Sequence, residues 1–208
     1  MTTRNTGVLF DLDGVLVDSE GEYSVFWGGM GDRYGLPSSF SADIKGTTLG
    51  EILQSFPEAD REGIVSELHH FEDNMLYPVY PGVMDFLNEL KANNIPSAIV
   101  TSSDDVKMGF LFRRHPELKE MVDVIVTGSM VTKSKPDPEG YLTAARLIGR
   151  DPADCFVFED SMQGLEAGRR SGATVIGIAT TNPREKVERI AHRTIGGFDG
   201  FSLKDMLG

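Results

Sequence analysis

Short apolar runs rich in β-branched residues alternate with segments of helical periodicity along most of this 208-residue chain. The predicted strands are Gly7–Leu12, Pro96–Thr101, Val122–Thr127, Cys155–Glu159 and Thr174–Ile178. The predicted helices are Val83–Asn93, Asp104–Arg113, Pro138–Ile148 and Met162–Ser171. Strand–helix alternation with short connections indicates an α/β fold, in which helices cover both faces of a mostly parallel sheet.

One long stretch interrupts this alternation. From about Asp18 to Tyr80 the apolar spacing is helical, and the segment Tyr77–Gly82 contains the two prolines and the glycine of a linker. We therefore predict two domains joined by hinge linkers: a sheet domain of residues 1–16 and 82–208, and an all-helical insertion of residues 17–81. The stretch from Asp18 to Tyr80 holds 12 acidic and 3 basic residues, so it carries −9 of the net charge of −12.

The charge and the hydropathy of the chain argue against two classes of partner. Nucleic acids attract clustered Lys and Arg, so a net charge of −12 disfavours them. We expect no membrane association, because no run of 18 apolar residues is present, and we expect a cytoplasmic protein, because the N-terminal residues lack a secretory h-region. If such a chain acts on an anion, its site needs local positive charge, which a bound divalent metal would supply.

Pairs of carboxylates follow two of the predicted strands. Asp11 and Asp13 lie at the end of the first strand, and Glu159 and Asp160 lie at the end of the fourth. The carboxyl ends of strands form the ligand crevice of an open α/β sheet. Carboxylates beside a core are costly unless something compensates them, and Mg²⁺ prefers carboxylate oxygens. The alternatives are an Asp-rich turn after the first strand and a helix N-cap at Asp160 or Ser161, although that cap leaves Glu159 unexplained.

Two further segments carry groups that suit a phosphate. Thr101 and Ser102 follow the second strand and offer hydroxyl and backbone N–H groups before a helix. The segment Lys133–Pro138 contains two lysines, either of which could neutralise charge on a phosphoryl group. Alternatively, the serine caps a helix and the lysines lie on an exposed loop. Spacing alone does not choose between Lys133 and Lys135.

These segments, FDLDGVLVDS, VTSS, KPDP and FEDSMQGLEAGRRSGA, resemble in order and spacing the four motifs of the haloacid dehalogenase superfamily. The resemblance covers residues 7–16 and about 82–208, and it is greatest to the β-phosphoglucomutase-like phosphatases. It implies a Rossmann-like core domain with an inserted helical cap. It also implies a magnesium-dependent phosphohydrolase that cleaves a small phosphomonoester, such as a sugar phosphate, through an aspartyl-phosphate intermediate.

The resemblance assigns a role to each motif residue. Asp11 would be the nucleophile, and Asp13 would be the general acid and base. Thr101 and Lys135 would hold the phosphoryl oxygens, with Ser102 nearby. Lys135 is preferred over the other lysine because it directly precedes a proline, as in the family pattern.

The same resemblance implies the metal site and leaves the substrate site open. Mg²⁺ would be bound by the side chains of Asp11 and Asp160 and by the backbone carbonyl of Asp13, with Glu159 contributing directly or through water. Substrate specificity would lie in the cap, for which the candidate residues are Lys45, Thr47 and Thr48.

Other activities within and outside this superfamily remain as alternatives. The mutases need a cap histidine and a cap-loop arginine, whereas Glu20–Trp27 and Lys45–Gly50 contain neither. The dehalogenases lack the acid–base Asp13, and a phosphonate hydrolase would need Lys45 for a Schiff base. A non-catalytic protein that binds a phosphorylated ligand would be expected to have lost Asp11, Asp13 or the metal carboxylates. We therefore expect a phosphatase acting on a small phosphorylated metabolite.

Overall fold

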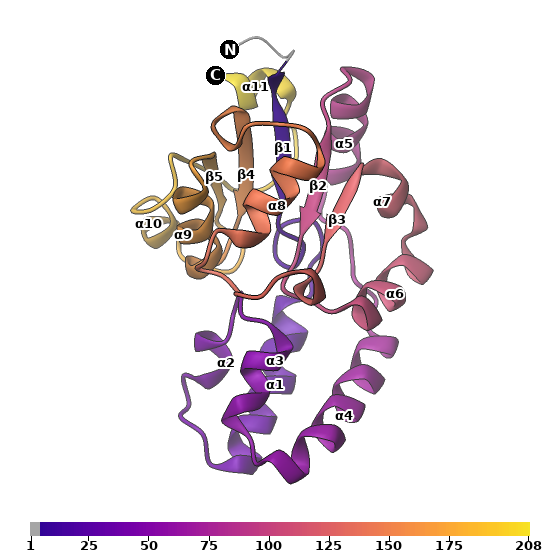
Figure 1. Ribbon diagram of the computed structural model, residues 1–208, viewed down its shortest axis with the longest axis vertical. Coiled ribbons are helices and arrows are strands. Elements are labelled where there is room, and N and C mark those ends of the chain that lie inside the picture. Colours follow the sequence, from indigo (N-terminus) through magenta and orange to yellow (C-terminus); the bar gives the residue numbers. More distant parts are fainter. Residues whose placement is uncertain (1–4) are drawn as a thin grey trace.

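The computed structural model describes residues 5–208 and contains a six-stranded, wholly parallel sheet with helices on both faces (Figure 1). The strand order is β3-β2-β1-β4-β5-β6. The strands are β1 Gly7–Phe10, β2 Ser97–Val100, β3 Val124–Val126, β4 Cys155–Glu159, β5 Thr174–Ile178 and β6 Arg193–Ile195. The predicted fold class, a parallel α/β core with a helical insertion, is confirmed.

The sequence patterns missed the sixth strand. β6 has three residues, Arg193–Ile195, and lies at the edge of the sheet beside β5. Arg193 is exposed, so the segment lacks the continuous apolar run by which buried strands are recognised. The patterns also missed three short helices, none longer than six residues: α7 (Pro116–Met121), α10 (Arg184–Val187) and α11 (Leu203–Leu207).

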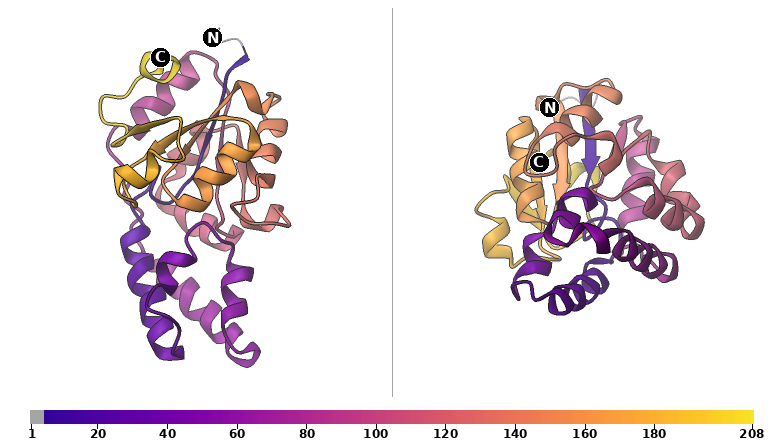
Figure 2. Two further views of the ribbon diagram at one scale, coloured as in Figure 1. Left: turned by 90° about the vertical axis from the view of Figure 1, so that its left-hand side faces the viewer. Right: turned by 60° about the horizontal axis from the view of Figure 1, so that its bottom comes forward.

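Helices pack on the two faces of the sheet (Figure 2). The helices are α1 Glu20–Tyr34, α2 Phe40–Asp43, α3 Leu49–Ile52, α4 Arg61–Asn74, α5 Val83–Ala92, α6 Asp105–Arg114, α7 Pro116–Met121, α8 Glu139–Leu147, α9 Met162–Ser171, α10 Arg184–Val187 and α11 Leu203–Leu207. Alternate strand residues point to opposite faces. Val8 and Phe10 therefore join the core cluster of α5, α6, α7 and α11, whereas Leu9 joins that of α8, α9 and α10. Within residues 5–208, no helix is both long and apolar enough to cross a membrane.

Helices α1–α4 lie together below the carboxyl edge of the sheet and have a core of their own (Figure 1). That core contains Trp27, Met30, Phe40, Ile52, Phe56, Ile64 and Leu68. The two chain segments that connect these helices to the sheet run side by side. The amide of Asp18 donates to the Pro78 carbonyl (2.8 Å), and the amide of Tyr80 donates to the Leu16 carbonyl (3.0 Å). Helices α1–α4, together with the segments that join them, are called the cap below.

Candidate active site

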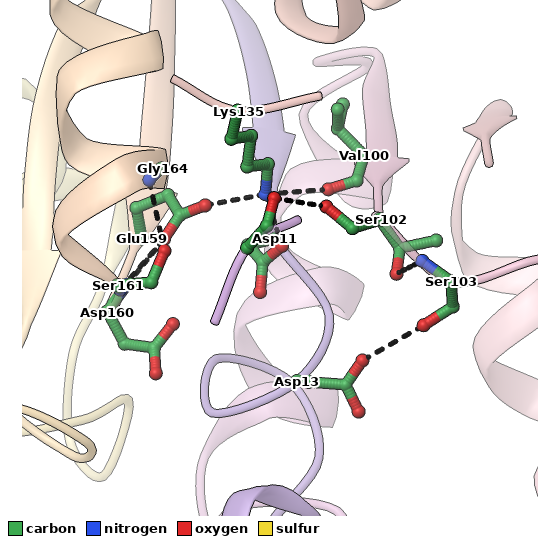
Figure 3. Close-up of polar contacts among 12 residues, drawn as sticks. Asp11, Asp13, Val100, Ser102, Ser103, Lys135, Glu159, Asp160, Ser161 and Gly164 are labelled. Atoms are coloured by element: carbon green, nitrogen blue, oxygen red, sulfur yellow. Dashed lines mark hydrogen bonds and ion pairs between the residues drawn. The ribbon is translucent and has the colours of Figure 1, made fainter. Parts of the chain in front are cut away.

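Parallel pairing of β1 with β2 and β4 brings three strand ends to one edge of the sheet. Asp11 follows β1, Thr101 follows β2, and Glu159 is the last residue of β4. The strand order reverses at β1, where ligands bind in open α/β sheets. Figure 3 shows the side chains that meet there.

Lys135 lies between the carboxylates of Asp11 and Glu159 (Figure 3). Its Nζ is 2.5 Å from Asp11 Oδ1 and 2.6 Å from Glu159 Oε1, and the side chain is only 7% exposed. Burial lowers the pKa of Lys135, but the two carboxylates more than compensate and raise it above its ordinary value. Lys135 is therefore a fixed cation beside Asp11. Lys133 instead has a side chain 71% exposed and pairs with Asp137.

Glu159 is fully buried, and protein donors satisfy both of its carboxylate oxygens. Oε1 accepts from Lys135 and from the Tyr141 hydroxyl (2.9 Å), and Oε2 accepts from the amide of Asp160 (2.9 Å) and from Ser161. A Cβ at Gly164 would lie 1.7 Å from Oε1, so only glycine leaves room for this carboxylate. Glu159 is thus placed to hold Lys135 against Asp11.

Asp11, Glu159 and Asp160 form an acidic group that could bind a metal ion. One carboxylate oxygen from each lies within 4.8 Å of the other two. Asp160 Oδ2 is buried and has no hydrogen-bond partner among residues 5–208. A Cβ at Gly14, where φ is 80°, would lie 2.1 Å from that oxygen. An unpartnered oxygen in a group of carboxylates fits a cation ligand.

Electrostatics within this acidic group favour a compensating cation. Burial, followed by the charges of Glu159 and Asp11, raises the pKa of Asp160 well above its usual range. Burial likewise raises the pKa of Asp11, although Lys135 opposes that effect. Both carboxylates would therefore ionise more readily next to a divalent metal ion.

The side chain of Asp13 is turned toward Ser103 and away from Asp160 (Figure 3). Its Oδ1 accepts from the Ser19 hydroxyl. Its Oδ2 accepts from Lys107 Nζ (2.5 Å) and from Ser103 Oγ (3.3 Å). This carboxylate therefore lies outside the acidic group that could bind a metal, and its hydrogen bonds go to Ser19, Ser103 and Lys107 instead.

Thr101 and Ser102 both line a cavity between the cap and the sheet domain. Thr101 is buried, and its hydroxyl oxygen accepts from the amide of Ser103 (3.1 Å). The Ser102 hydroxyl donates to the carbonyl of Gly46 in the cap (2.7 Å). Ser102 therefore contacts the cap at the edge of the predicted phosphate site.

The three predicted substrate-binding residues differ in their positions. Lys45 lines the cavity and forms a 2.7 Å ion pair with Glu20, and both side chains are 21% exposed. Thr47 also lines the cavity, and its hydroxyl donates to the carbonyl of Ile44 (2.6 Å). Thr48 lines a smaller adjoining crevice next to Lys135.

Sequence reasoning missed Lys107 as a cavity residue, together with Ser103 and Glu72. One signal was present. Lys107 falls in the first turn of the helix that follows the second motif, where the helix dipole disfavours a positive charge. A lysine at such a position needs a partner, and here that partner is Asp13.

A family model for haloacid dehalogenase-like hydrolases matches residues 6–172. The chain belongs to this family. Among its haloacid dehalogenase-like relatives is hexitol phosphatase A of Escherichia coli, which is 34% identical over 91% of each chain. Another is validoxylamine A 7'-phosphate phosphatase of Streptomyces hygroscopicus, which is 29% identical over 85% of this chain and 87% of the relative.

Solved structures of haloacid dehalogenase-like proteins have the same fold. A family IA, variant 3 hydrolase from Entamoeba histolytica is 25% identical and superposes with a TM-score of 0.84 over 97% of both chains. A β-phosphoglucomutase from Clostridium difficile, 20% identical, has a TM-score of 0.80 over 97% of this chain and 95% of its own. The haloacid dehalogenase family indicated by the motifs is confirmed by the family model, and these structures share its fold.

Proposed function

We propose that this protein is a magnesium-dependent phosphatase that hydrolyses a small organic phosphomonoester through a phosphorylated Asp11. The observation that carries the proposal is the position of Asp11. Its carboxylate lies 2.5 Å from a buried lysine and within 4.8 Å of two other carboxylates, one of which has an oxygen with no partner in the described chain, residues 5–208. A nucleophile beside a fixed cation and a potential metal site suits attack on a phosphoryl group.

The chain's own residues divide the work of the reaction. Asp11 attacks phosphorus, while Lys135 and Thr101 bind the phosphoryl oxygens, with Ser102 at the edge of the site. Asp13 gives a proton to the leaving oxygen. It then accepts a proton from the water that hydrolyses the aspartyl-phosphate.

The side chains of Asp11 and Asp160 and the backbone carbonyl of Asp13 would hold the metal. Oxygen donors of this kind suit Mg²⁺. Bound Mg²⁺ supplies positive charge to the phosphoryl oxygens. Glu159 contributes by holding Lys135 and the Asp160 amide, because both of its oxygens already accept hydrogen bonds from protein groups.

We further propose that the leaving group is a sugar, a sugar alcohol or a similar polar group, and that Lys45 and Thr47 contact it from the cap. Thr48 would act beside Lys135 rather than on the leaving group. The name of hexitol phosphatase A supports a polyhydroxylated substrate for this chain as well. Hydrolysis is favoured over mutase activity. In the segment where a mutase needs a histidine this chain has Tyr23, and the hydroxyl of Tyr23 already donates to Glu72 (2.8 Å).

An Asp11→Asn variant tests this proposal, because an amide has nearly the shape of the carboxylate and is a far poorer nucleophile. Release of p-nitrophenolate from p-nitrophenyl phosphate should fall to background. Asp85→Asn, at an exposed position in α5, is the matched control and should keep the parental rate. Activity of Asp11→Asn within about tenfold of the parent, which corresponds to ~1.4 kcal/mol of activation free energy, would rule out the covalent mechanism. A panel of sugar phosphates, polyol phosphates and nucleotides then identifies the substrate class.

A further inference from the structure

Lys107 is a buried cation outside the four motif segments. It lies in the first turn of α6, and its side chain is 3% exposed. Its Nζ donates to Asp13 Oδ2 (2.5 Å) and to Ser103 Oγ (2.8 Å). A buried ammonium is costly unless it is paired, so the contact with Asp13 explains how this lysine is accommodated.

The cap covers the other side of Lys107. Its Nζ lies 4.5 Å from the centre of the Tyr23 ring, a distance at which the face of an aromatic ring attracts a cation. The Tyr23 hydroxyl in turn donates to Glu72 of α4 (2.8 Å). Lys107 therefore lies between a carboxylate of the sheet domain and an aromatic ring of the cap.

These contacts fix the direction of the Asp13 carboxylate. Lys107 and Ser103 hold Oδ2, and Ser19, next to the first cap helix, holds Oδ1. Figure 3 shows the carboxylate turned toward Ser103 and away from Asp160. The orientation of Asp13 thus depends on Lys107 and Ser103 of the sheet domain and on Ser19 at the start of the cap. Lys107 is the charged member of that set.

We propose that Lys107 is a positioning residue that holds the Asp13 carboxylate where it accepts the proton of the hydrolytic water. This inference rests on the proposed function. In that step the water oxygen bonds to phosphorus while the bond between phosphorus and the Asp11 oxygen breaks. The water proton passes to Asp13, and inorganic phosphate and the Asp11 carboxylate are released. A misdirected Asp13 therefore slows decay of the phosphoenzyme.

Formation of the phosphoenzyme responds differently when the leaving group is p-nitrophenolate. That group departs as a stable anion and needs little protonation by Asp13. A variant that only misdirects Asp13 therefore forms the phosphoenzyme at nearly the parental rate and loses it slowly. General loss of substrate binding or of the fold would instead slow formation as well.

The test is rapid mixing of Lys107→Met with p-nitrophenyl phosphate and Mg²⁺, with acid quenching to measure the phosphoenzyme. Methionine keeps most of the length of the lysine chain and removes the charge. We expect formation within about twofold of the parent and decay slower by about tenfold or more, because general base catalysis contributes roughly a hundredfold or more to such steps. Lys119→Met, at an exposed position in α7, is the matched control and should behave as the parent.

Ser103→Ala provides a second measurement that leaves the lysine in place. It removes one donor to Asp13 Oδ2 and one partner of Lys107, so decay should slow by a smaller factor with formation unchanged. If Lys107→Met does not fold, Ser103→Ala alone tests whether the contacts to Asp13 matter: decay of the phosphoenzyme should be slower while its formation is unchanged.

Two results would overturn the inference. One is a parallel loss of formation and decay, and the other is an unchanged rate of decay. Failure of the proposed function looks different, since no phosphoenzyme would form even in the parent, and Asp11→Asn would keep its turnover.

Discussion

Replacement of Gly164 by alanine isolates the contribution of Glu159 to the fold and to the site. A Cβ at this position would lie 1.7 Å from Glu159 Oε1 and 2.3 Å from Oε2. Glu159 cannot simply rotate away, because its side chain is fully buried and both oxygens accept hydrogen bonds. The added methyl group therefore displaces the carboxylate from Lys135.

The expected cost follows from the contacts that are lost. Hydrogen bonds to charged groups contribute about 2 kcal/mol each, so losing two of those made by Glu159 costs about 4 kcal/mol. Alanine favours a helix over glycine by about 1 kcal/mol, which opposes this loss. We expect Gly164→Ala to lower the free energy of unfolding by about 3 kcal/mol. It should also reduce kcat/KM, because Lys135 loses one of its two carboxylate partners.

Urea unfolding of the parent, Gly164→Ala and Gly109→Ala measures this effect. Gly109 lies in the middle of α6, and a Cβ there would meet nothing within 4 Å. The control should therefore gain about 1 kcal/mol of stability from helix propensity alone. Both substitutions exchange glycine for alanine in a helix, but their effects on the free energy of unfolding should have opposite signs. If Gly164→Ala were as stable as the parent, Glu159 would not be locked as described.

Two other measurements probe the ionisable groups of the cavity. Burial raises the pKa of Glu72 from 4.5 to about 7, with Lys107 and Tyr23 opposing the shift. The folded state therefore binds the Glu72 proton more tightly, and stability falls as pH rises through this window. In the parent this group should lower the free energy of unfolding by about 3 kcal/mol between about pH 4 and about pH 8, and urea unfolding of Glu72→Gln should lack that decrease. If the pH dependence of Glu72→Gln matched that of the parent, the raised pKa of Glu72 would be contradicted. Mg²⁺ at about a hundred times its Kd should stabilise the parent by ~2.7 kcal/mol in thermal unfolding, and an equal shift in Asp160→Asn would argue against Asp160 as a ligand.

The sequence by itself determined the sheet and the position of its reactive edge. Continuous apolar runs such as Cys155–Glu159 are long enough to identify buried strands, and polar residues at their carboxyl ends must meet at one edge of a parallel sheet. That reasoning, together with the motif resemblance, selected Asp11 and Lys135. The edge strand Arg193–Ile195 was missed because a half-exposed strand of three residues carries too few apolar positions for a pattern.

Tertiary structure alone decided which side chains far apart in the sequence contact one another. Lys107 and Asp13 are 94 residues apart, and Tyr23 and Glu72 are 49 residues apart, so no local pattern predicts either contact. Lys45, a candidate substrate residue, is likewise paired with Glu20 at the cavity wall. Periodicity reports which face of an element is buried, whereas the packing of elements within each domain fixes which opposite charge each long side chain meets.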